Sequence, residues 1–366
     1  MAGELVGDNK AHNVYGWSDM ELEFKPDFES ARSKWDAFWR GDMLTMGGAI
    51  LPKEGVDPVP HPPYLVGRDG NFDSVIDQLL AYAGSHEFIG STIPFFILEW
   101  GPDTFSAFTG ADLVFGAGTS WCMPYVEDWN DVEIRFDRNS KWWRITEDLI
   151  GAVRERCDGK LLICPPTIVA NLDCLSAVRG QERLLFDLIE RPDEIKQALK
   201  QVCKAHTEVL DAYAELLDFE RYGSINIAGS YVTGSQSRPQ CDASCLIGPE
   251  MFREFVIPCL EYETMDADVA QYHLDGPGAI RHLDVLGELK RLGMIDYTPD
   301  PKEKPDDWLH VRRKIDDLGK GQTFWAGSLD EAKKIRQNYH SGKMHMLIGA
   351  STKSEAEGII EEIDRM

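Results

Sequence analysis

Short apolar runs alternate with amphipathic segments over most of the 366 residues. The runs that have the length of buried strands are 44–51, 93–99, 161–169, 223–229, 269–275, 294–298, 323–326 and 344–349. Segments with helical periodicity lie between most of them, at 143–158, 181–188, 193–217, 249–263, 279–292, 308–318 and 329–337. Strands that alternate with helices indicate a parallel sheet, and eight such strands favour a sheet that closes into a barrel. We therefore expect α/β architecture, as a single (β/α)8 TIM barrel.

The barrel is expected over residues 26–366, preceded by an N-terminal arm at 1–25 that is polar and mixed in character. Residues 26–40 carry apolar side chains at helical spacing and precede Gly41, so they predict a leading helix. A doubly wound open sheet is the alternative, but neither GxGxxG nor GxxxxGK[ST] occurs. The proline-rich stretch 50–72 predicts a long loop at the barrel mouth, either a lid or a surface excursion without function.

The composition of the chain argues against several classes of binding partner and cellular location. The formal net charge is −24, which opposes binding to phosphate backbones and anionic membranes. The eight cysteines form no CxxC pair, so reduced thiols are expected rather than a disulfide framework. The first residues contain no apolar signal segment, and no apolar run approaches the ~18 residues that span a bilayer. These features predict a soluble, cytoplasmic protein.

The strongest candidate for chemistry is the strand end at 271–278. Here His273 and Asp275 are two residues apart, so both side chains lie on one face of the strand. The Gly-Pro-Gly sequence at 276–278 then turns the chain. Catalytic groups of barrel enzymes lie at the carboxyl ends of strands, which makes both residues catalytic candidates. A structural histidine–carboxylate pair is the alternative.

Further polar and aromatic residues follow other strands. Glu99 ends an apolar strand, where a carboxylate could bind substrate or metal, act as a base, or form a salt bridge. Asp242 is a further catalytic candidate in the loop after 223–229. Aromatic side chains after the Glu99 strand could line an apolar pocket or pack ordinarily. The candidates for substrate binding are Trp121, Tyr125, Glu99, Asn226, Tyr231 and Arg238.

Seven segments together resemble the uroporphyrinogen decarboxylase superfamily, in particular its methyltransferase-type branch. They are 107–111, 115–121, 127–129, 175–180, 188–194, 248–252 and 272–279. The resemblance extends from about Phe38 to the C-terminus, and 272–279 is its most specific part. It implies a (β/α)8 barrel that is often a homodimer. It also implies either removal of acetate carboxylates from a porphyrinogen or methyl transfer through a corrinoid protein.

The porphyrinogen activity is rejected because the arginine-rich N-terminal motif of those decarboxylases is missing. A substrate with many carboxylates requires such a cluster on a chain of charge −24. Methyltransferases of this branch often bind zinc through His-x-Cys and a later cysteine. His273 matches the histidine, but Asp275 replaces the cysteine and 349–351 contains none. The resemblance therefore leaves a harder zinc site, with His273 and Glu99 as its ligands.

The favoured hypothesis is a methyltransferase that moves a methyl group from a small O- or N-methylated compound to a partner corrinoid protein. His273 would be an acid or a metal ligand that Asp275 orients, and Asp242 would be a ligand or base. The alternative is a decarboxylase or lyase that acts on a small carboxylic acid other than uroporphyrinogen. A third hypothesis is a catalytically silent barrel that serves as a binding subunit.

Overall fold

The computed structural model describes residues 21–366, so most of the predicted arm at 1–25 lies outside the described residues. Residues 21–25 pack onto the rest of the chain. Leu22 and Lys25 are fully buried, and Lys25 Nζ donates hydrogen bonds to Phe88 O at 2.9 Å and Gly90 O at 3.2 Å. No helix in the described part of the chain is both long and apolar enough to cross a membrane.

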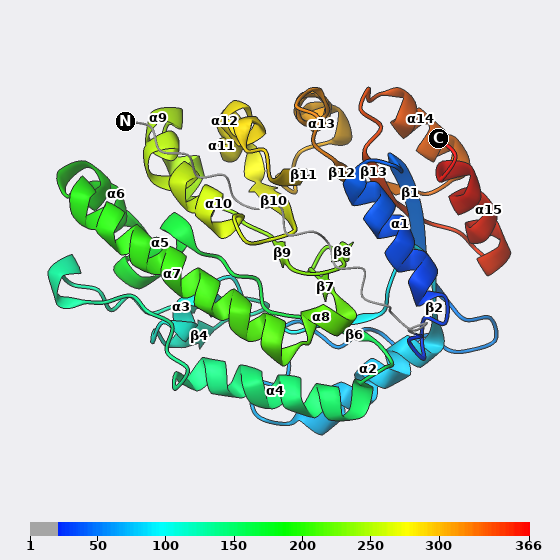
Figure 1. Cartoon of the computed structure of the whole chain (residues 1–366), viewed down its shortest axis with the longest axis horizontal. Coiled ribbons are helices and arrows are strands. Elements are labelled where there is room, and N and C mark those ends of the chain that lie inside the picture. The colour runs from blue at the N-terminus through cyan, green and yellow to red at the C-terminus, as the bar shows by residue number, and fades with distance from the viewer. Residues whose placement is uncertain (1–20) are drawn as a thin grey trace.

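Mixed α/β architecture is observed, with an elongated outline (Figure 1). One sheet has the order β12–β13–β1–β2, formed by Gln322–Ala326, Met344–Ile348, Thr45–Pro52 and His86–Gly90. The first and last long strands, β1 and β13, pair in parallel. β2 instead runs antiparallel to β1, which departs from the expected alternation.

A second sheet has the order β11–β10–β9, formed by Leu292–Thr298, Val269–Asp275 and Gln236–Ser237, all parallel. A parallel bridge between Met294 and Gly321 connects β11 with the start of β12. The parallel pair β3–β6 joins Phe95–Ile97 to Leu162–Cys164. Two antiparallel pairs are β4–β5 (Leu113–Phe115, Ser120–Cys122) and β7–β8 (Ser224–Ile225, Tyr231–Val232). Ladder hydrogen bonds do not join these sheets into one closed ring within residues 21–366.

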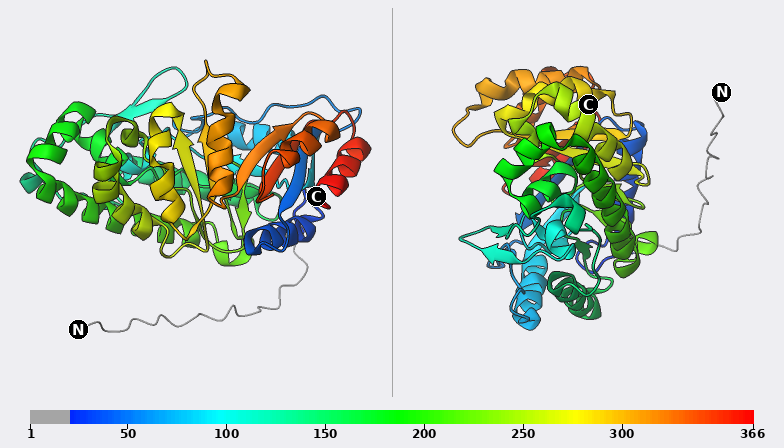
Figure 2. Two further views of the ribbon diagram at one scale, coloured as in Figure 1. Left: turned by 90° about the horizontal axis from the view of Figure 1, so that it is seen from above. Right: turned by 90° about the vertical axis from the view of Figure 1, so that its left-hand side faces the viewer.

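Helices follow most strands and cover their outer faces (Figure 2). The long α7, Pro192–Leu216, packs against α5, Asn171–Arg179, and α6, Gln181–Glu190, at one end of the molecule. The opposite end carries α1, Phe28–Arg40, with α14, Leu329–Gln337, and α15, Lys353–Ile363. The remaining helices of eight or more residues are α2 (Phe72–Ser85), α4 (Lys141–Cys157) and α13 (Pro305–Asp317).

The two faces of the β12–β13–β1 sheet differ in their partners. Phe324 and Met346 are buried in a cluster with side chains of α14 and α15, because alternate strand residues point toward those helices. Trp325 and Leu347 are register partners on the opposite face, and Trp325 is 64% exposed. The face away from the helices therefore stays open at the carboxyl ends of these strands.

Candidate functional site

The strand β10 occupies the residues expected for it, Val269–Asp275. Tyr272 and Leu274 are buried in the main core, so the alternate residues Gln271, His273 and Asp275 face the other way. His273 is half-buried, and Asp275 is exposed at the strand end. The predicted shared face of His273 and Asp275 is therefore observed.

Behind His273 lies a chain of buried polar side chains. Asn226 Nδ2 donates to Gln271 Oε1 and to Gln236 Oε1, both at 2.8 Å. Gln271 Nε2 in turn donates to Asp296, the register partner of His273 on β11. Asn226 is thus held by its neighbours, next to the strand that carries His273.

The surroundings of His273 favour its neutral imidazole. Burial lowers the pKa of its imidazole, the Arg238 charge lowers it further, and Asp275 and Asp296 oppose these effects. Its Nδ1 atom is buried and has no hydrogen-bond partner in the described part of the chain. A neutral imidazole offers one acceptor and one donor nitrogen, which suits binding or proton acceptance better than proton donation.

Four aspartates lie close to one another at the strand ends, Asp275 among them acts on His273, and the sequence indicated only two of the four. Asp173, in the first turn of α5, accepts hydrogen bonds from the backbone N–H groups of Asp242 and Ala243, both at 2.8 Å. Asp103 begins α3, Thr104–Phe108, and accepts the N–H of Cys122 at 2.7 Å. We call Asp103, Asp173, Asp242 and Asp275 the rim aspartates.

Burial raises the pKa values of three rim aspartates, and neighbouring carboxylates add to the shift for two of them. Burial, followed by the charge of Asp242, raises the pKa of Asp173 to about 7. Desolvation, followed by the charge of Asp275, raises the pKa of Asp242 to about 6. Burial also raises the pKa of Asp103, whose charge acts on both Asp173 and Asp242. The rim therefore holds carboxyl groups that remain partly protonated near neutral pH.

A strained asparagine supports this rim. Asn171 is fully buried and has a φ of 42°, in the left-handed region that non-glycine residues seldom adopt. Its Nδ2 donates to Gln240 O at 2.9 Å and to Glu263 Oε1 at 3.1 Å. Burial raises the pKa of Glu263 well above its ordinary value, which favours its neutral form. Asn171 thus fixes the segment before Asp242 relative to the start of α5.

The Glu99 side chain accepts hydrogen bonds that hold neighbouring segments of the chain together. Its Oε1 accepts from Trp100 N at 3.0 Å and Thr104 Oγ1 at 2.7 Å, and its Oε2 accepts from Thr167 N at 3.0 Å. Burial raises its pKa to about 7, although these hydrogen bonds oppose the shift. Both carboxylate oxygens are therefore already engaged in holding the ends of β3 and β6.

The predicted aromatic residues divide between the rim and the core. Trp121 is 46% exposed on the β4–β5 hairpin. It precedes Cys122, whose backbone N–H donates a hydrogen bond to Asp103. Tyr125 is also partly exposed, and its pKa is raised by burial and by the neighbouring Cys174 and Cys122. The backbone of Trp121 thus adjoins a residue that bonds Asp103, and Tyr125 is connected to the rim through Cys122 and Cys174, which adjoins Asp173.

Tyr231 lies elsewhere. It is buried in the cluster that α1 forms with β7 and β8, and its hydroxyl donates to Tyr222 O at 2.9 Å. Its ring packs edge-on against Phe28, with centroids 5.6 Å apart. The structure therefore does not bring Tyr231 together with the rim aspartates.

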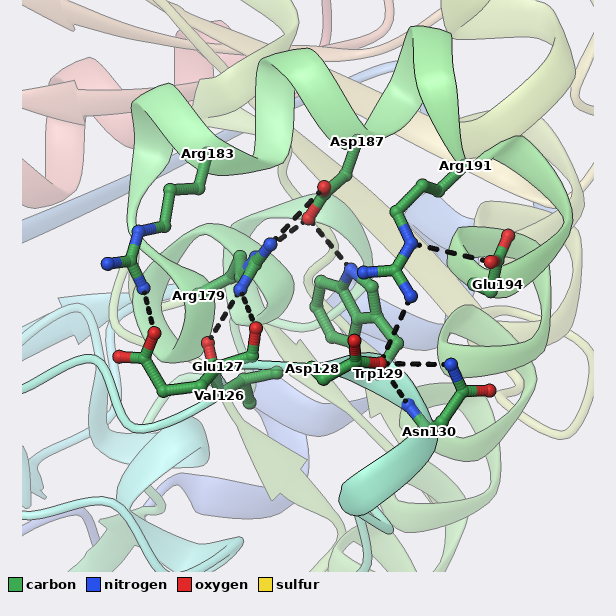
Figure 3. Close-up of polar contacts among 10 residues, drawn as sticks. All are labelled: Val126, Glu127, Asp128, Trp129, Asn130, Arg179, Arg183, Asp187, Arg191 and Glu194. Atoms are coloured by element: carbon green, nitrogen blue, oxygen red, sulfur yellow. Dashed lines mark hydrogen bonds and ion pairs between the residues drawn. The ribbon is translucent and has the colours of Figure 1, made fainter.

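A buried ion pair anchors the segment that carries the aromatic residues (Figure 3). Arg179 donates to Asp187 Oδ2 at 2.7 Å, to Val126 O at 3.0 Å and to Glu127 O at 2.5 Å. Trp129 Nε1 also donates to Asp187 Oδ2, at 2.8 Å. Three of the segments on which the family resemblance rests, 127–129, 175–180 and 188–194, meet here. Their shared role is structural.

No group of three or more His, Cys, Asp or Glu side chains among residues 21–366 is placed to hold a metal ion. The oxygens of Glu99 accept three hydrogen bonds from neighbouring residues. Zinc at His273 and Glu99 stays a prediction from the sequence, and the function proposed below uses no metal.

Comparison with known proteins gives a structural likeness only. No family model matches the chain, and no curated protein matches it in sequence. Among solved structures, a methyltransferase from Methanosarcina mazei superposes with a TM-score of 0.58 at 13% identity. The match covers 92% of this chain and 98% of the other. At this identity the likeness shows the fold.

Proposed function

We propose that the chain is a methyltransferase that takes a methyl group from a small O- or N-methylated compound and transfers it to a corrinoid carried by a partner protein. The observation that carries the proposal is the set of partly protonated rim aspartates beside a neutral His273. The fold shared with a methyltransferase supports it. We further propose that the strands form a (β/α)8 barrel, which the parallel pairing of β1 with β13 supports.

The rim aspartates can supply the proton that demethylation of an ether requires. An alkoxide or phenolate is a poor leaving group unless a proton reaches its oxygen as the bond to the methyl carbon breaks. Asp242, with a pKa of about 6, and Asp173, with a pKa of about 7, can donate that proton near neutral pH. We assign the acid role to Asp242, because both oxygens of Asp173 accept backbone hydrogen bonds.

His273 has a different part in this proposal. Its lowered pKa argues against the acid role that the sequence suggested, since the neutral ring has no excess proton to give. Its imidazole, whose Nδ1 has no partner among the described residues, would instead orient the donor through a hydrogen bond. Trp121 and Tyr125 would exclude water on the other side of the rim.

The corrinoid would supply the nucleophile for the methyl group when its partner protein docks. The exposed Trp325 and Ile50, on the open face at the ends of β12 and β1, fit an apolar contact surface for such a partner. Homodimer formation remains an expectation from the family resemblance.

A second candidate is a decarboxylase or lyase that acts on a small carboxylic acid. The observation that favours it is Arg238, a buried cation close enough to His273 to lower its pKa. Such an enzyme would hold a carboxylate at Arg238 and use His273 for proton transfer.

Two assays of the purified protein distinguish methyl transfer from decarboxylation. It is incubated with a reduced corrinoid protein and a panel of methoxy compounds and methylamines, and methylation of the corrinoid is followed by absorbance. Carbon dioxide release from small carboxylic acids is measured in parallel without corrinoid. Methylation that depends on the protein supports the proposal. Carbon dioxide release without any methylation would replace it with the second candidate.

A further inference from the structure

We propose that a cavity beside β6, β7 and β9 is a binding site for a single small carboxylate group, with Arg238 as its charge partner. The cavity has a volume of about 50 Å³. Its walls come from the end of β6, from β7 and β9, and from α7. The proposal concerns a site that exists whether or not the chain transfers methyl groups.

Arg238 is the main evidence. Its side chain is 12% exposed, yet its guanidinium donates no hydrogen bond to any residue from 21 to 366. Its ion pair with Asp296 is long, 3.9 Å between Nη2 and Oδ2, and Asp296 also accepts hydrogen bonds from Gln271 and Thr323. Its Nε atom is buried and has no hydrogen-bond partner in the described part of the chain, which is costly for a donor removed from water. A ligand that accepts hydrogen bonds would remove that cost.

Other side chains of the same cavity wall lack partners too. Tyr213 Oη, Ser237 Oγ and His206 Nδ1 are buried atoms without hydrogen bonds. These residues are at most 4% exposed. Burial lowers the pKa of His206 to about 4, so its ring is neutral. Two hydroxyl donors and a guanidinium that converge on one cavity require an acceptor.

Charge and size identify the ligand class. One guanidinium matches one negative charge, whereas a polycarboxylate would need a cluster of cations. A cavity needs about 10–15 Å³ for each water-sized site, so this one takes roughly three to five heavy atoms. Formate, acetate or the carboxylate end of a larger acid meets both limits.

The experiment measures binding of acetate and formate by calorimetry, at constant ionic strength set with chloride. We expect saturable binding to the wild type and at least a tenfold weaker affinity for Arg238→Gln. Tyr213→Phe, which keeps the ring, should weaken binding severalfold and guards against a misfolded arginine variant. The matched control is Arg312→Gln, a buried arginine that lies outside the cavity wall and bonds Thr323 O at 2.8 Å. This control should bind as the wild type does.

Competition identifies the source of the carboxylate. Displacement of acetate by methoxyacetate, but not by 2-methoxyethanol, would mean that the site holds the acid end of a substrate. Binding of acetate without displacement by methoxyacetate would mean that it takes a free anion. Absence of saturable binding, or equal binding by wild type and Arg238→Gln, would overturn the proposal and leave a water-filled cavity. Neither result depends on whether methyl transfer is observed.

Discussion

Replacing Arg179 with methionine tests the anchor of the segment that lies next to the rim. Arg179 and Asp187 are 9% and 5% exposed, and the guanidinium bonds both carboxylate oxygens and two backbone carbonyls. Arg179→Met leaves the Asp187 charge buried with Trp129 Nε1 as its remaining donor. Breaking a buried pair in this way typically costs about 3–5 kcal/mol. We expect a loss of this size in the free energy of unfolding.

Two further variants give the measurement its controls. Arg183→Met removes an ion pair with Glu127 whose side chains are 53% and 78% exposed, so it should cost about 0–1 kcal/mol. Arg179→Met combined with Asp187→Leu removes both buried charges and should be less destabilised than Arg179→Met alone. Urea unfolding followed by tryptophan fluorescence and circular dichroism provides the assay. A loss below about 1 kcal/mol for Arg179→Met would refute the reasoning, because it would mean that water already solvates the pair.

Other predictions concern the rim. The pKa of Asp242 is raised in the folded chain, so its contribution to stability is full below its unfolded pKa of about 4 and is lost as pH rises through about 6. Asp242→Asn should therefore flatten the fall in unfolding free energy between these pH values, and an unchanged slope would contradict the shift. Asn171→Ala should be less stable than Asn171→Gly by about 1 kcal/mol. Both variants lose the hydrogen bonds to Gln240 and Glu263, but the φ of 42° strains alanine and not glycine. Equal urea midpoints for the two would contradict that strain.

Most strands could be predicted from the sequence because their apolar residues mark buried segments. The run 269–275 matches β10 in full, and 44–51 and 344–349 match β1 and β13 within a residue at each end. The antiparallel β2 and the β4–β5 hairpin were missed. These strands are three to five residues long, too short for a periodic pattern to be recognised.

The candidate site was only partly visible in the sequence. His273 and Asp275 could be recognised because one strand holds both of them. Asp103 and Asp173 could not, because they follow different strands and approach Asp242 only in the folded chain. A signal that could have found them is that each lies at or near the start of the helix that follows a strand, on the side where catalytic groups of barrels lie.

Three segments of the family resemblance have a structural role and supply no residue to the proposed site. Residues 127–129, 175–180 and 188–194 converge on the Arg179–Asp187 pair rather than on the rim (Figure 3). Such a pair depends on fixed geometry, so it can mark a fold without marking a reaction. Of the seven segments, 272–279 contributes His273 and Asp275 to the proposed site, and 115–121 contributes Trp121.

The central claim is that Asp242 protonates the leaving group, and the dependence of the rate on the methyl donor tests it most directly. An ether leaves as an alkoxide that needs a proton, whereas a quaternary ammonium leaves as a neutral amine that does not. Single-turnover methylation of the corrinoid protein is measured for wild type and Asp242→Asn with both donors. General acid catalysis contributes about 10²–10⁴-fold, so the variant should lose that factor with the ether and little with the ammonium donor. An equal loss with both donors, or none with the ether, would contradict the claim.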